Sequence, residues 1–159
     1  MGMGHLKVTD TTAEMMDSFA GGVFEMERWK DYIGVLHRET ESMREYFLWQ
    51  LFTEGIAMVF EQEVVGNREY FHQDRDGWKE WCDDNLRLIK ESFDRDLDVM
   101  TDDTQRYFGD WVKFNGYGDT GYYLGTKFVR FLLTEDSFDN LVKYDMEEVA
   151  AGYERFMAC

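Results

Sequence analysis

The segment from residue 41 to residue 65 is the feature that most constrains the fold. Its apolar side chains return at helical spacing at Phe47, Leu51, Met58 and Val65. No proline interrupts the pattern, because the whole chain contains none. Gly66 follows directly, and glycine is the commonest residue just after a helix end. The pattern therefore predicts one long helix, the longest or second-longest of the chain.

The rest of the chain shows the same preference for helices. Apolar residues recur at helical spacing, whereas the period-two alternation of strands is scarce. Further helices are expected at 11–20, 24–39, 77–98, 101–114, 121–134 and 137–144, and from Asp145 onward. A glycine-rich loop is expected at 115–121. The aromatic residues expected in the core are Trp78, Trp81, Phe93, Tyr107, Phe108 and Trp111. With 159 residues and no linker or repeat, residues 1–159 are predicted to form a single all-α domain.

Several helix starts carry recognisable capping residues. Ser137 is expected to cap the 137–144 helix, and Asp145 with Glu148 has the spacing of a capping box at the start of the last helix. Thr101 or Asp102 is expected to cap the 101–114 helix.

Glu54 lies inside the apolar stripe of the long helix, and Gly55 follows it. An ionised carboxylate in a protein core is costly unless it is paired or bound to a metal. Three interpretations follow: an ion pair with a basic side chain of another helix, a partly exposed place at a helix crossing where Gly55 lets a neighbour approach, or a metal ligand. We expect Glu54 to be mostly buried and to contact His37 or a basic side chain, with Arg130 and Lys127 as the first candidates.

The charge and cysteine content exclude some partners and environments. A formal net charge of −16 argues against a nucleic-acid backbone or an anionic membrane as partner. There is no apolar run near the roughly 20 residues that span a membrane, and no signal-peptide pattern. Two cysteines make no disulfide framework, so a reduced, cytoplasmic protein is expected. The partner, a protein or peptide, is left open.

Three stretches together resemble a known family. They read LFTEGIAMVFEQE from Leu51, GDTGYYLGTKFVRFLL from Gly118 and DNLVKYDMEEV from Asp139. The first is similar to the second metal-binding helix of gluzincin-type zinc metallopeptidases, which often carries Glu-Gly-x-Ala. All three, over about residues 33–150, resemble the YjaZ-like group of predicted zinc-dependent proteases. The resemblance implies a helical domain and a zinc-ligand role for Glu54.

The chain departs from this family at the decisive motif. It contains no His-Glu-x-x-His, and if His37 takes the place of the second histidine, the first histidine and the catalytic base fall on Ile33 and Gly34. Catalytic zinc normally has three protein ligands and a water. The leading hypothesis is therefore a non-catalytic descendant, a binding or interaction module, with no resident cofactor. A fragment of a longer peptidase is a further alternative.

The alternative hypothesis is that the chain is an enzyme, a metal-dependent hydrolase with an altered or incomplete site. His37 and Glu41 stand four residues apart on one expected helical face, and with Glu54 they would offer zinc or another divalent metal one imidazole and two carboxylates. Tyr122 and Tyr123 are the candidates to donate a hydroxyl to a substrate oxyanion. The competing interpretation of these tyrosines is that their rings pack in the core and their hydroxyls bond at its rim.

Overall fold

The computed structural model describes residues 40–159, and those residues are all-α. The expected helices at 11–20 and 24–39, and with them His37, Ile33 and Gly34, lie outside the described residues. Between residues 40 and 159 there is no strand, only an isolated bridge between Phe114 and Tyr117. The all-α prediction is confirmed.

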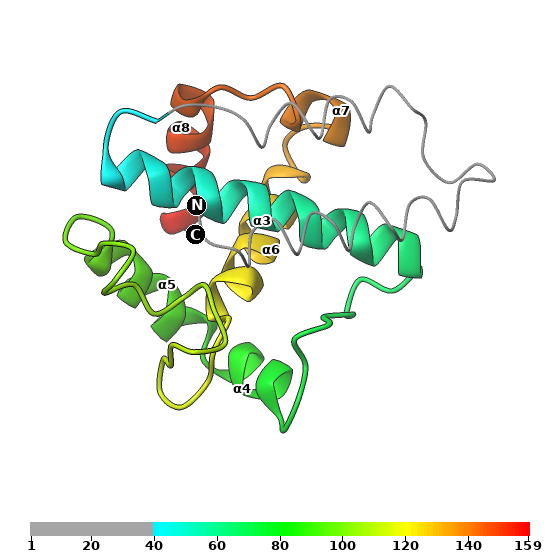
Figure 1. Cartoon of the computed structure of the whole chain (residues 1–159). Coiled ribbons are helices and arrows are strands. Elements are labelled where there is room, and N and C mark those ends of the chain that lie inside the picture. Colours follow the sequence, from blue (N-terminus) through cyan, green and yellow to red (C-terminus); the bar gives the residue numbers. More distant parts are fainter. Residues whose placement is uncertain (1–39) are drawn as a thin grey trace.

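The long helix α3 (Met43–Val65) runs through the middle of the described structure (Figure 1). The hydroxyl of Ser42 caps it by accepting from the Glu45 backbone N–H at 3.2 Å, and Gly66 ends it with φ 77°. It is the longest helix between residues 40 and 159, as predicted. Helices α4 (Trp78–Asp84) and α5 (Leu86–Asp96) lie on one side of α3, and helices α7 (Phe138–Leu141) and α8 (Met146–Met157) lie on the other (Figure 1). Neighbours on several sides explain why most residues of α3 are buried.

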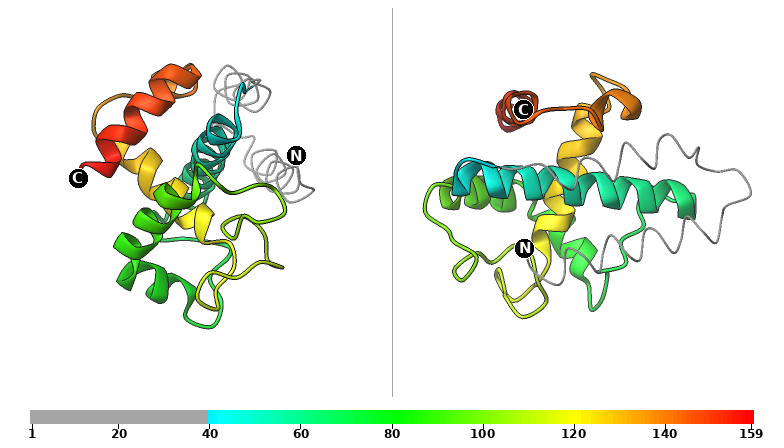
Figure 2. Two further views of the ribbon diagram at one scale, coloured as in Figure 1. Left: turned by 90° about the vertical axis from the view of Figure 1, so that its left-hand side faces the viewer. Right: turned by 45° about the horizontal axis from the view of Figure 1, so that its top comes forward.

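Helix α6 (Thr120–Leu132) crosses α3 at a steep angle (Figure 2). At the crossing, Gly55 of α3 faces Gly125 of α6. A Cβ atom added to Gly125 would lie 2.5 Å from the Leu51 carbonyl oxygen and 3.3 Å from the Gly55 Cα. The two backbones are therefore in direct contact, which only residues without a side chain permit. This contact answers why a core helix carries glycine next to Glu54.

The prediction of a single helix at 77–98 is wrong, because the chain forms two helices there. They are α4 (Trp78–Asp84) and α5 (Leu86–Asp96), joined at Asn85 with φ −122° and ψ 20°. The Asn85 side chain donates to the Trp81 carbonyl oxygen at 2.8 Å. Asparagine side chains compete with helical backbone bonds in this way, so the apolar periodicity continues through a break in the backbone.

The helix predicted at 101–114 is also wrong, since residues 101–119 form turns. The buried Gln105 side chain forms hydrogen bonds with backbone groups of this loop, in place of helical backbone bonds. Its Oε1 accepts from the N–H groups of Tyr107 at 2.9 Å and Phe108 at 2.8 Å, and its Nε2 donates to the Phe108 carbonyl at 2.7 Å. Trp111, expected in the core, is 68% exposed. It belongs to this loop rather than to a helix, so no helical face turns it inward.

The last two helices begin where their caps predicted. Helix α7 (Phe138–Leu141) starts after Ser137, whose hydroxyl accepts from the Asn140 N–H at 3.2 Å. Helix α8 (Met146–Met157) starts with the expected capping box between Asp145 and Glu148, both bonds at 2.8 Å. Helix α8 packs on α3 and α6, and its Tyr153 and Phe156 rings contact the Phe128 ring of α6. Among the helices from α3 to α8, none is long and apolar enough to cross a membrane.

Candidate functional site

Glu54 lies in the middle of α3 and is buried, with 1% of its surface exposed. The predicted burial is confirmed. Tyr122, in the first turn of α6, is close enough to feel its charge: burial raises the pKa of Tyr122, and the negative charge of Glu54 raises it further. The Tyr122 hydroxyl thus stays protonated beside a carboxylate. Glu54 and Tyr122 therefore influence each other electrostatically near the glycine crossing of α3 and α6.

Glu41 does not join Glu54. It is exposed and precedes the helix, and its backbone N–H donates to Glu45 Oε1 at 2.9 Å. At a rise of about 1.5 Å per residue, the stretch from Met43 to Glu54 alone spans about 16 Å. Two ligands of one zinc ion lie within about 4–5 Å of each other, since each bond is near 2 Å. One ion cannot contact both carboxylates, so the set of His37, Glu41 and Glu54 does not fit a single metal.

The remaining residues offer no replacement in the part of the chain that the structure describes. From residue 40 onward, no three His, Cys, Asp or Glu side chains come together in a way that could hold a metal ion. Of the predicted ligands, only Glu54 lies at a buried position there, and His37 lies outside it.

The two candidate tyrosines have different surroundings. Tyr123 donates its hydroxyl to Asp83 Oδ1 at 2.6 Å, and Lys127 lies over its ring, 5.0 Å from the centroid. That arrangement matches the packing interpretation. The ring of Tyr122 packs edge-on against Phe108 at 5.5 Å, and the residue is 5% exposed. Of these two tyrosines, only Tyr122 has its pKa raised by the charge of Glu54.

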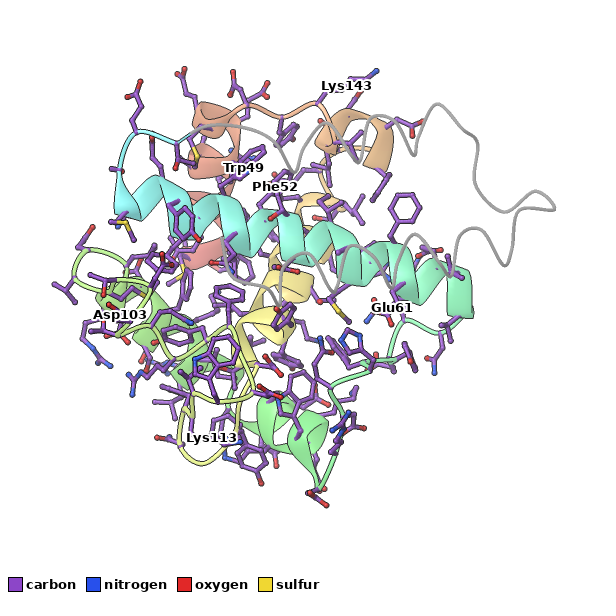
Figure 3. All side chains as sticks on the ribbon, in the orientation of Figure 1. Trp49, Phe52, Glu61, Asp103, Lys113 and Lys143 are labelled. Carbon is purple, nitrogen blue, oxygen red and sulfur yellow. The ribbon has the colours of Figure 1, made fainter. Side chains whose placement is uncertain are left out.

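The sequence analysis missed a second buried carboxylate on α3, that of Glu61. Glu61, labelled in Figure 3, is 2% exposed. Its two oxygens lie 2.8 and 3.1 Å from His72 Nδ1. Next to this pair, Gln73 Nε2 donates to the Met58 sulfur at 3.4 Å. Glu61 stands seven residues after Glu54, hence on the same helical face, and that spacing was the available signal. These contacts hold the connection after Gly66 against α3.

Arg130, one of the two basic residues expected near Glu54, is part of another arrangement. Its guanidinium donates to Gln62 Oε1 at 2.8 Å and to Glu63 Oε1 at 3.1 Å. Gln62, 1% exposed, in turn donates from Nε2 to the Tyr70 carbonyl oxygen at 2.9 Å. Lys127, the other candidate, lies over the Tyr123 ring. The end of α3 is thereby linked to both α6 and the following connection.

A hollow of about 470 Å³ lies beside this arrangement, where α3, α6 and α7 meet. Apolar side chains form part of its wall, among them Val59, Phe60, Leu133 and Phe138. Arg68, Arg130, Glu63 and Asp136 supply charge at it. Its size falls in the range of small-ligand pockets, roughly 300–1,000 Å³. We call it the α3–α6–α7 hollow.

Comparisons with family models, curated proteins and solved structures found no match for this chain. The fold of residues 40–159 defines the chain as an all-α helical domain.

Proposed function

We propose that this chain is a non-catalytic binding module, related to gluzincin-type metallopeptidases of the YjaZ-like group, that binds a segment of a protein or peptide without hydrolysing it. The observation that carries the proposal is the α3–α6–α7 hollow, a space of about 470 Å³ with both apolar and charged lining.

The sequence supports the absence of hydrolysis. The resemblance assigns the first histidine and the general base to Ile33 and Gly34, which can neither bind zinc nor take a proton from water. Glu41, the one nearby carboxylate that could complete the ligand count, is about 16 Å or more along the helix axis from Glu54.

The packing of the inherited residues supports the same proposal. Glu54 is buried beside Tyr122 at the place where α3 and α6 touch through their glycines. Tyr123 donates to Asp83. These side chains contribute to the packing of α3 against α6. The α3–α6–α7 hollow, in contrast, has an exposed rim at Thr134 and Ser137.

Metal analysis and a peptidase assay on the purified whole chain test this proposal. We expect less than one tightly bound zinc per chain after dialysis, and no cleavage of unstructured protein substrates with added zinc. One zinc per chain, lost in both Glu54→Gln and His37→Ala, together with peptidase activity, would instead establish the altered metallohydrolase. Glu91→Gln on the exposed face of α5 is the matched control, because it removes the same charge from a surface carboxylate.

A further inference from the structure

We draw no further inference here: the strongest candidate, the pair formed by buried Glu61 on α3 and His72 in the connection between α3 and α4, belongs to the candidate site already described, and among residues 40–159 no third His, Cys, Asp or Glu side chain joins it to hold a metal ion.

Discussion

Replacement of Gly55 by alanine should destabilise the domain, although alanine is the better helix former. A Cβ at Gly55 would overlap the Gly125 carbonyl oxygen, lie 2.6 Å from the Gly125 carbonyl carbon and 2.7 Å from Val129 Cγ2. The first two atoms are backbone of α6, so no side-chain rotation relieves the overlap. Helices α3 and α6 would have to move apart, along the contact that positions Glu54 beside Tyr122.

The magnitude follows from two opposing effects. Overpacking of a core typically costs about 1–3 kcal/mol, and a clash with backbone belongs at the upper end, near ~3 kcal/mol. The change from glycine to alanine inside a helix returns roughly 1 kcal/mol. The net loss of unfolding free energy should therefore be about 2 kcal/mol. At roughly 4 °C per kcal/mol for a domain of this size, Tm should fall by about 8 °C.

Thermal and urea unfolding followed by circular dichroism measure this effect. Gly152→Ala on α8 is the matched control, because its Cβ would meet Leu132 Cδ2 at 2.7 Å, the end of a flexible side chain. Gly125→Ala should resemble Gly55→Ala, and the double variant should lose less than the sum, since the helices separate only once. A Gly55→Ala variant as stable as Gly152→Ala would refute the backbone contact.

Three further predictions concern stability. Glu54→Gln should lower the unfolding free energy by roughly 1–3 kcal/mol, because it places an amide N–H donor at a position where a carboxylate oxygen is buried, with 1% of the residue exposed. Glu91→Gln at the surface should be neutral, and equal urea midpoints for the two variants would contradict this. Burial raises the pKa of Tyr122 and Tyr153, so the stability that their protonated hydroxyls contribute is fully present below the ordinary tyrosine pKa of about 10 and is lost as the pH rises through the raised values. Tyrosinate absorbance should then appear for these residues only together with unfolding, and their ionisation in a folded chain would show the reasoning to be wrong. Asp145→Ala should cost about 1 kcal/mol in urea unfolding through loss of the α8 capping box, and a neutral result would mean that the cap adds nothing.

Local chemistry fixed much of the helical pattern in advance. The stripe that ends at Gly66 predicts α3, and the caps at Ser137 and Asp145 predict the starts of α7 and α8. These signals act within a few residues, so the sequence alone is sufficient to interpret them. The same reasoning failed at Asn85 and Gln105, where a side chain bonds to nearby backbone and replaces helical bonds without disturbing the apolar spacing.

The candidate site likewise has one feature that the sequence predicts and others that only the tertiary structure shows. Glu54 lies in an apolar stripe, and this was enough to predict that it is buried, because burial of the neighbouring apolar side chains is favourable and carries Glu54 inward with them. Which side chains it meets depends on how α6 crosses α3, and that crossing is set where Gly55 and Gly125 touch, two residues far apart in the chain. The pairing of Arg130 with Gln62 arises from the same crossing. The sequence thus determined the helices and the burial of Glu54, whereas only tertiary packing decided the partners and the hollow, since contacts between distant segments leave no local pattern.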